Sequence, residues 1–168
     1  MQITLRPASI EDLSLLQHWD QQPHVKASDD EDDDWNWEYE LERFPAWREQ
    51  LIAELDGEPI GCVQIIDPAE EETHYWGQVE PNLRAIDIWI GEAEDLGKGY
   101  GTVMMNLALE RCFADDKVTA VLIDPLETNH GAIHFYERIG FQFVERRRFN
   151  GSHCLVYKYD RADWETKN

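Results

Sequence analysis

The sequence has few basic residues and no long apolar run. Only 15 of its 168 residues are Lys or Arg, against 35 Asp or Glu, and the formal net charge is -20 at pH 7. Because phosphate is repelled by this charge, nucleic acid and anionic membranes are poor candidates for the natural partner. No apolar stretch reaches membrane-spanning length, and the mean hydropathy is -0.59. A cationic partner or substrate is the better expectation, and a generic acidic soluble protein is the alternative.

Cysteine is also scarce. Cys62, Cys112 and Cys154 have no metal-ligand spacing, and their odd number favours reduced thiols over a disulfide framework. His130 and His134 lie four residues apart, but no third ligand is close in the sequence. The first residues show no basic end followed by an apolar run, so we expect no signal peptide. We therefore expect a cytoplasmic protein without a metal.

What the sequence does contain is typical of one globular domain, spanning residues 1–168. Hydrophobic residues make up 42% and charged residues 30%. The pattern predicts helices after Ser9, over 103–113 and over 129–139. Strands are expected near 3–5, 51–55, 59–66, 85–90, 119–123, 141–144 and 155–159. The acid run 29–34 is expected to be a loop, and the aromatic-rich segment 35–47 has no firm assignment.

A glycine-rich turn separates the strand at 85–90 from the helix at 103–113. Its sequence is Gly97-Lys98-Gly99-Tyr100-Gly101. A strand, a glycine turn and a helix together form a common phosphate-binding arrangement, because backbone N–H groups converge at the helix N-terminus. The spacing fits neither the dinucleotide fingerprint nor the nucleotide-triphosphate loop. The alternative is a turn needed only for tight packing of the strand on the helix.

Three segments together resemble the GCN5-related N-acetyltransferase (GNAT) superfamily. They are Leu96–Gly101, the strand ending at Asp124, and Asn129-x-x-Ala132-x-x-x-Tyr136-x-x-x-Gly140-Phe141. The finer resemblance is to the aminoglycoside 6'-N-acetyltransferases, on Asp56–Gly61, Ile86-Asp87, Leu96–Gly101, Asp124-Pro125 and Asn129. Siderophore-biosynthesis lysine acetyltransferases share much of this pattern. Leu96 departs from the general superfamily motif, which has Gln or Arg there.

The resemblance implies an α/β GNAT fold with a mixed, mainly antiparallel central sheet flanked by helices. It also implies direct acetyl transfer from acetyl-CoA to a primary amine through a tetrahedral intermediate. The expected acceptor is a cationic small molecule, an aminoglycoside 6'-amine. The alternatives are another amine (a hydroxylysine-type siderophore precursor, a polyamine or a protein terminus) or a CoA-binding domain without turnover. The protein is expected to be a monomer or a homodimer.

The resemblance also implies where acetyl-CoA is held. Backbone amides from Gly97 to Thr102 would cradle the pyrophosphate, and a backbone N–H of the strand at 88–90 would stabilise the thioester oxygen. Asn129 is expected as a helix N-cap, a CoA contact, or both. The implied acetyl-CoA contacts are Ile88, Trp89, Ile90, Gly97, Lys98, Gly99, Tyr100, Gly101, Thr102, Asn129, Ala132 and Tyr136.

Asp87 and Tyr136 are the expected catalytic residues. Because Asp87 alternates with Ile86 and Ile88, it is expected to share a cleft-lining face with Trp89. It would hold the amine and pass a proton through water, although a surface acid is the alternative. Tyr136 would donate a proton to the leaving thiolate, yet its apolar helix face also fits a core tyrosine.

Three further residues are expected to bind the acceptor, together with Asp87. Asp124 ends a strand at an edge where ligands commonly sit, and turn capping before Pro125 is the alternative. Trp35 and Trp37 follow the acid run 29–34, which would attract a polycation or else form a solvated loop.

Overall fold

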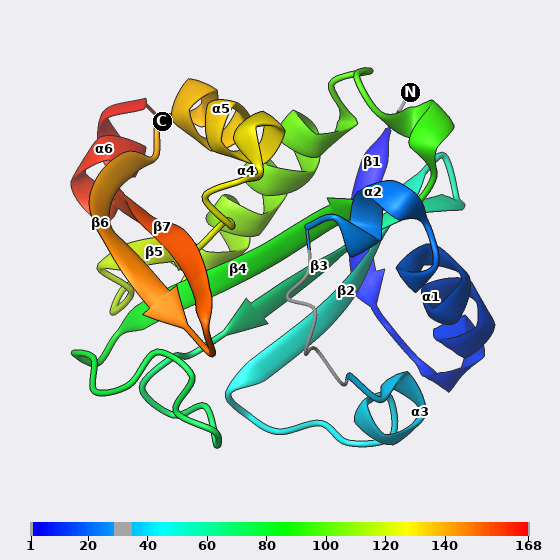
Figure 1. The fold of residues 1–168 in the computed structure, drawn as a ribbon, viewed down its shortest axis with the longest axis horizontal. Coiled ribbons are helices and arrows are strands. Elements are labelled where there is room, and N and C mark those ends of the chain that lie inside the picture. Colours follow the sequence, from blue (N-terminus) through cyan, green and yellow to red (C-terminus); the bar gives the residue numbers. More distant parts are fainter. Residues whose placement is uncertain (1, 29–34, 168) are drawn as a thin grey trace.

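A seven-stranded sheet runs through the centre of the computed structural model, which describes residues 2–28 and 35–167 (Figure 1). The strand order is β1-β2-β3-β4-β5-β7-β6, and only the β4–β5 pair is parallel. The strands are β1 (Ile3–Pro7), β2 (Arg48–Leu55), β3 (Glu58–Ile66), β4 (Leu83–Ile90), β5 (Ala120–Ile123), β6 (Gln142–Phe149) and β7 (Ser152–Asp160). The expected mixed, mainly antiparallel sheet is confirmed, and the acid run 29–34 lies outside the described residues.

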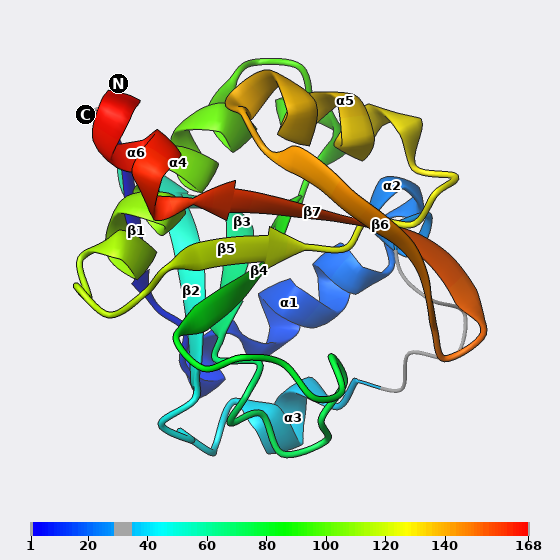
Figure 2. The ribbon, with the colours of Figure 1, turned by 90° about the vertical axis from the view of Figure 1, so that its left-hand side faces the viewer.

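Helices cover both faces of the sheet. Figure 2 shows α4 and α5 on one side and α1 and α3 on the other. The helical elements are η1 (Ile10–Asp12), α1 (Leu13–Asp20), α2 (Pro23–Lys26), α3 (Trp37–Glu40), η2 (Ala93–Asp95), α4 (Tyr100–Phe113), α5 (His130–Ile139) and α6 (Arg161–Lys167). None of the helices in the described part of the chain is long and apolar enough to cross a membrane.

Local sequence signals set several of these elements. Ser9 and Asp12 form a capping box where the sequence predicted the start of a helix, and Arg6 binds both Asp12 carboxylate oxygens at 2.8 and 2.9 Å. The turn between β2 and β3 has positive φ at Asp56 (50°) and Gly57 (90°), as a two-residue hairpin requires. The strands predicted near 51–55 and 59–66 are therefore confirmed, and they pair as an antiparallel hairpin.

Strand β6 and helix α6 differ from the pattern-based expectation. Strand β6 continues to Phe149, beyond the predicted end at 144. It is the last strand of the sheet, and most of its side chains are exposed, so charged residues extend it without any apolar alternation. Helix α6 was not predicted, because long-range contacts hold it: Arg161 donates to the carbonyls of Val118, Phe113 and Asp115.

The two strands of the parallel pair separate soon after they meet. β5 pairs with β4 only at Leu83–Ala85, opposite Ala120–Leu122, although β4 continues to Ile90. The remaining half of β4 keeps its partner on the other side, because β3 pairs with it as far as Ile90. The sheet is therefore open beside the second half of β4.

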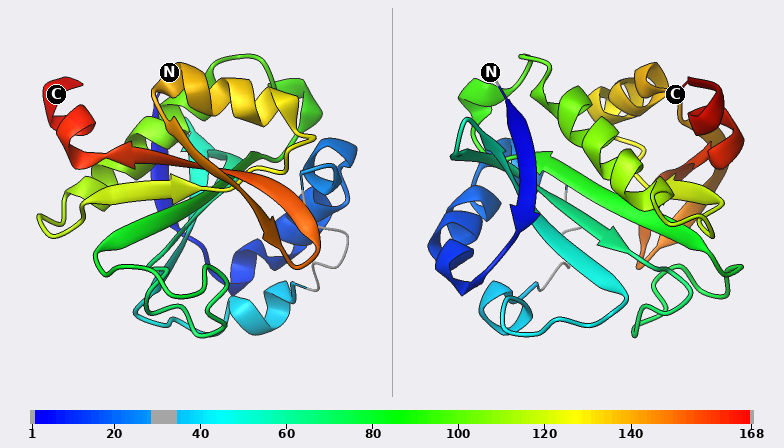
Figure 3. Two further views of the ribbon diagram at one scale, coloured as in Figure 1. Left: turned by 60° about the vertical axis from the view of Figure 1, so that its left-hand side comes forward. Right: turned by 180° about the vertical axis from the view of Figure 1, so that it is seen from behind.

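Helix α1 fixes the far end of β4. The Trp19 side chain is fully buried, and its Nε1 donates to Glu92 Oε1 at 3.3 Å. Its indole ring lies directly over Gly91, so that a Cβ atom at this position would be only 2.0 Å from the ring. The rear view in Figure 3 shows α1 on the side of the sheet away from α4. Residue 91 must be glycine for this contact to form.

We predict that Gly91→Ala destabilises the protein by about 3 kcal/mol, because the added methyl group forces Trp19 out of its packed position. Denaturant unfolding measures the change in the free energy of unfolding. Gly131→Ala on α5 is the matched control, since a Cβ there meets no atom within 4 Å. Equal effects of the two substitutions would contradict the argument.

Candidate active site

A cleft of about 1040 Å³ lies beside the separated strands. Its walls come from α1, α3, β3, β4, the loop 67–82, α5 and the segment that follows β5. It brings together nine of the residues predicted from sequence, namely Trp35, Trp37, Asp87, Ile88, Trp89, Asp124, Asn129, Ala132 and Tyr136. Residues far apart in the chain therefore meet at one place.

The second half of β4 presents backbone groups to this cleft. Gly91 donates its N–H to the Ile60 carbonyl on β3. Because backbone groups alternate sides along a strand, the N–H and C=O of Ile88 and Ile90 point away from β3. His24 on α2 donates from Nε2 to the Ile90 carbonyl at 2.8 Å. The Ile88 groups thus face the opening that β5 leaves.

The glycine turn lies outside the residues that line the cleft, at the N-terminus of α4. Gly97 and Gly99 have φ of 74° and 83°, and a Cβ at either position would meet no atom within 4 Å. Glycine at positions 97 and 99 is thus explained by backbone conformation and not by packing, whereas a Cβ atom added at Gly101 would lie 3.3 Å from the Phe135 ring. The turn leaves the N-terminus of a 14-residue helix accessible to an anion.

Asp87 and Asp124 are the acidic pair of the cleft. Asp87 is exposed on β4, and Asp124 is partly buried just after β5. Burial and the charge of Asp87 raise the pKa of Asp124 to about 8, while a hydrogen bond from Tyr75 and the charge of Arg147 oppose this rise. The two carboxylates therefore repel each other when both are ionised, and a cation bound between them would remove this repulsion.

Tyr136 lies in the core and also reaches the cleft. Its ring packs against Phe141 and Phe135 with centroid distances of 5.8 and 5.3 Å. Burial and the charges of Asp87 and Asp124 raise the pKa of its phenol. The hydroxyl thus stays protonated at neutral pH, which suits a proton donor.

Tryptophan side chains form another wall. Trp37 lies between Trp35 and Trp89, with centroid distances of 5.8 and 6.2 Å. Its Nε1 donates to Asp20 Oδ2 at 2.6 Å, which ties α3 to α1. The aromatic segment with no firm assignment from sequence thus contributes a short helix, α3, to the cleft.

A buried ion pair holds α3 against the sheet. Arg48 at the start of β2 donates to Glu40 Oε1 at 2.9 Å and to the Glu40 carbonyl at 3.1 Å. Both side chains are largely buried. Separation of the pair would leave an unpaired charge in the protein, so it fixes where the tryptophan wall stands.

Sequence reasoning placed Glu70–Glu72 and Glu80 of the loop 67–82 at the edge of the acceptor site but missed its aromatic residues. Tyr75 donates from its hydroxyl to Asp124 Oδ2 at 2.6 Å, and Trp76 and Phe149 also line the cleft. The signal in the sequence was the pair Tyr75-Trp76 inside an otherwise polar segment. Large aromatic residues in a loop usually have a packing partner, here Phe149 of β6.

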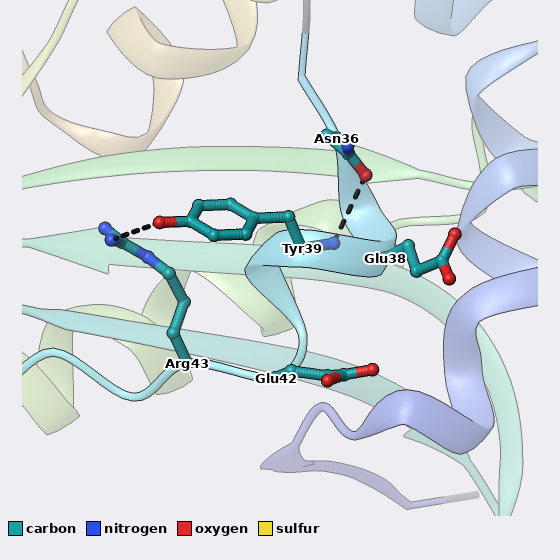
Figure 4. Close-up of a pocket in the computed structure, with 5 residues that line it drawn as sticks. All are labelled: Asn36, Glu38, Tyr39, Glu42 and Arg43. Atoms are coloured by element: carbon teal, nitrogen blue, oxygen red, sulfur yellow. Dashed lines mark hydrogen bonds between the residues drawn. The ribbon is translucent and has the colours of Figure 1, made fainter.

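A second pocket of about 500 Å³ lies on the outer side of α3 (Figure 4). Figure 4 shows Tyr39 between Asn36 and Arg43, with its hydroxyl directed towards the guanidinium group. No residue predicted for the site lines this pocket. Within residues 2–28 and 35–167, no group of three His, Cys, Asp or Glu could hold a metal ion. The cleft beside β4 is therefore the candidate active site.

Comparison with known proteins agrees with the resemblance found in the sequence. Residues 9–149 match the acetyltransferase (GNAT) domain family. The aminoglycoside N(6')-acetyltransferase type 1 of Klebsiella pneumoniae is 31% identical over 148 residues, covering 83% of this chain and 74% of the relative. The kanamycin resistance protein of Rhizobium radiobacter is 37% identical over 73 residues, covering 43% of this chain and 68% of the relative.

Solved structures of similar proteins superpose on nearly the whole chain. The aminoglycoside acetyltransferase AAC(6')-Ib in complex with coenzyme A and kanamycin superposes with a TM-score of 0.86 at 28% identity, covering 98% of both chains. The AAC(6')-Ib complex with ribostamycin and coenzyme A superposes with a TM-score of 0.88 at 26% identity, covering 98% of this chain and 97% of that one.

We predict that Asp124→Asn stabilises the protein more at high pH than at low pH. The pKa of Asp124 is raised to about 8. Because this exceeds the ordinary value of about 3.9, the ionisation of Asp124 lowers stability progressively as pH rises from about 4 to about 8. The amide cannot ionise, so its melting temperature should exceed that of the parent near pH 9 but not near pH 4.

Thermal unfolding at the two pH values measures this difference. Asp116→Asn, at an exposed position outside the cleft, is the control and should change stability equally at both. If the stability change caused by Asp124→Asn is also the same at both pH values, the prediction is contradicted, because ionisation of Asp124 then does not lower the stability of the protein.

Proposed function

The chain belongs to the acetyltransferase (GNAT) family, and we propose that it transfers the acetyl group of acetyl-CoA directly to the 6'-amino group of an aminoglycoside. The observation that carries this proposal is the pairing of Asp87 and Asp124 in a cleft open to the free edge of β4. The likeness to aminoglycoside N(6')-acetyltransferases over 83% of the chain supports it.

The residues present fit acetyl-CoA. The positive φ of Gly97 and Gly99 shapes a turn at the N-terminus of α4, where backbone N–H groups suit a pyrophosphate. Leu96 provides no polar side-chain contact, so the backbone and Lys98 carry this part of the binding. The opening between β4 and β5 leaves the Ile88 N–H available to a carbonyl oxygen.

The acceptor half of the cleft fits a molecule with several ammonium groups. Six acidic residues line the cleft against two basic ones: Asp20, Glu40, Glu71, Glu72, Asp87 and Asp124 against Lys26 and Arg48. Glu40 and Arg48 are paired with each other, which leaves the excess of negative charge on the other walls. Such walls attract a polycation, and Trp35, Trp37 and Trp89 give its sugar rings an apolar surface.

The chemistry requires two proton movements. Acetyl-CoA, when bound, supplies the thioester carbonyl carbon that a neutral amine attacks. Asp87 holds the incoming ammonium group and passes a proton from it to solvent through water. Tyr136 gives its phenolic proton to the sulfur as the C–S bond breaks and the C–N bond forms, and then regains a proton from solvent.

The cleft draws on residues from Asp20 to Cys154, so we also propose that the chain acts as one domain. Neither the acidic walls nor the aromatic wall can form from one half of the sequence alone.

We predict that Asp87→Asn lowers turnover by about 10²- to 10³-fold while CoA binding is retained, because only amine positioning and proton transfer are lost. Release of CoA thiol from acetyl-CoA measures turnover across aminoglycosides, polyamines, lysine derivatives and short peptides. Calorimetry with CoA measures binding by the parent and the variant.

Turnover restricted to aminoglycosides with a free 6'-amine would support the proposal. Turnover of another amine class would keep the reaction and replace the acceptor. An inactive parent that still binds acetyl-CoA would favour a binding domain without turnover. Glu94→Gln, on η2 outside the cleft, is the matched control and should leave turnover unchanged.

A further inference from the structure

The hydroxyl of Tyr75 is bound to one of the two paired carboxylates. It donates to Asp124 Oδ2 at 2.6 Å, across 49 positions of sequence. Tyr75 belongs to the loop 67–82, whereas Asp124 follows β5. Both side chains line the cleft. The contact therefore joins a loop on the acceptor side to an acid on the sheet.

The Tyr75 ring is held by a stack on β6. Its plane lies 9° from that of Phe149, with ring centroids 4.6 Å apart. On Phe149, the guanidinium of Arg147 lies 4.7 Å from the ring centroid. Arg147 also donates from Nη2 to the Trp76 carbonyl at 2.8 Å. These contacts fix the ring independently of Asp124.

The loop itself is braced from within. Glu71 is buried, and its Oε1 accepts the Tyr75 backbone N–H at 3.0 Å and the Thr73 hydroxyl at 2.6 Å. The Glu71 bonds to Thr73 and to the Tyr75 N–H, together with the Arg147 bond to the Trp76 carbonyl, thus fix the backbone on both sides of Tyr75. A hydroxyl held this firmly directs the carboxylate that it binds.

The charge balance around Asp124 depends on this hydroxyl. The groups that face Asp124 are Asp87 on β4, Arg147 on β6 and Tyr136 on α5, in addition to Tyr75. Cys154 on β7 lies close to Tyr75 and is buried. Burial and Asp87 raise the pKa of Asp124, while Tyr75 and Arg147 lower it. Loss of the hydroxyl would therefore raise that pKa further.

We propose that Tyr75 is a positioning residue, whose hydroxyl orients the Asp124 carboxyl group towards the acceptor and stabilises its ionised form when an ammonium group binds. This inference rests on the proposed function, because it assigns Asp124 to the acceptor. The stack on Phe149 provides the rigidity, and the hydroxyl provides the hydrogen bond. A tyrosine in a surface loop thereby sets the affinity of the acceptor half of the cleft.

We predict that Tyr75→Phe raises the acceptor KM about tenfold near neutral pH, since one hydrogen bond to a charged group is lost. It should also move the acidic limb of kcat/KM to higher pH, because the pKa of Asp124 rises when the hydroxyl is absent. Steady-state kinetics from about pH 6 to about pH 9 measure both effects. Loss of activity by the same factor at every pH would overturn the proposal in favour of a merely structural role.

Two further variants sharpen the kinetic test. Tyr39→Phe removes a phenolic hydroxyl that accepts a hydrogen bond from Arg43 at 3.4 Å on the outer side of α3. It should leave KM and the pH profile unchanged. Phe149→Leu retains the Tyr75 hydroxyl but removes its stacking partner. It should raise KM in the same direction as Tyr75→Phe, and an unchanged KM would overturn the role of the stack.

A measurement without substrate separates this inference from the proposed function. Aspartate labelled with ¹³C at its side-chain carboxyl allows Asp124 to be titrated by NMR, with Asp124→Asn to assign its signal. The Asp124 transition should lie at higher pH in Tyr75→Phe than in the parent. An unchanged transition overturns the inference even if aminoglycosides are acetylated. A shifted transition in a protein that acetylates none of them supports the role of the hydroxyl and refutes only the proposed acceptor.

Discussion

The early end of the pairing between β4 and β5 is the constraint on which the site depends. A parallel pair that continued to Ile90 would use the backbone groups of Ile88 in the sheet and close the opening between its faces. Because β5 stops pairing opposite Ala85, these groups face the cleft instead. The cleft can therefore contact α5, on one side of the sheet, and α1 and α3, on the other. The packing of Trp19 on Gly91 holds the far end of β4 while its edge stays unpaired.

The electrostatics of the cleft follow from the same geometry. Strand β4 carries Asp87, and the chain leaving β5 carries Asp124, so the acids approach each other where the sheet opens. Their mutual repulsion is tolerated because Tyr75 and Arg147 face Asp124. A site of this kind is less stable empty than it would be with neutral residues, and a bound cation would relieve the repulsion between the charges. The proposed binding of a cationic acceptor would thus use an arrangement that folding alone would not favour.

Much of the frame was predictable from local sequence, because short-range signals encode it. The Asp56-Gly57 turn, the Ser9 capping box and the Asn129 N-cap each depend on a few neighbouring residues. Alternation along β4 correctly placed Asp87 on the face opposite Ile86. The local pattern singled out the glycine turn and the strand end at Asp124, but their spacing alone leaves structural roles open. The catalytic role expected for Tyr136 and the acetyl-CoA role expected for the turn came from the likeness to a family.

The missing parts depend on contacts across the fold. Tyr75 meets Asp124 and Phe149 through a loop whose path no local pattern specifies. Helix α3 has four residues, too few for a helical period, and the Arg48–Glu40 pair anchors it. His24 reaches the Ile90 carbonyl from another short helix. Each of these features is fixed by tertiary packing, which a sequence pattern does not report.

The two halves of the cleft have separate origins in the chain. The parts suited to acetyl-CoA come from one continuous stretch, from β4 through α5, which also carries Asp87 and Asp124, whereas α3, the loop 67–82 and the end of β6 would build the remaining acceptor walls. Mutations in those outlying segments can reshape what enters the cleft while the donor half keeps its geometry. Evolution can therefore change the acceptor by substitutions in one wall at a time, without altering the residues suited to acetyl-CoA.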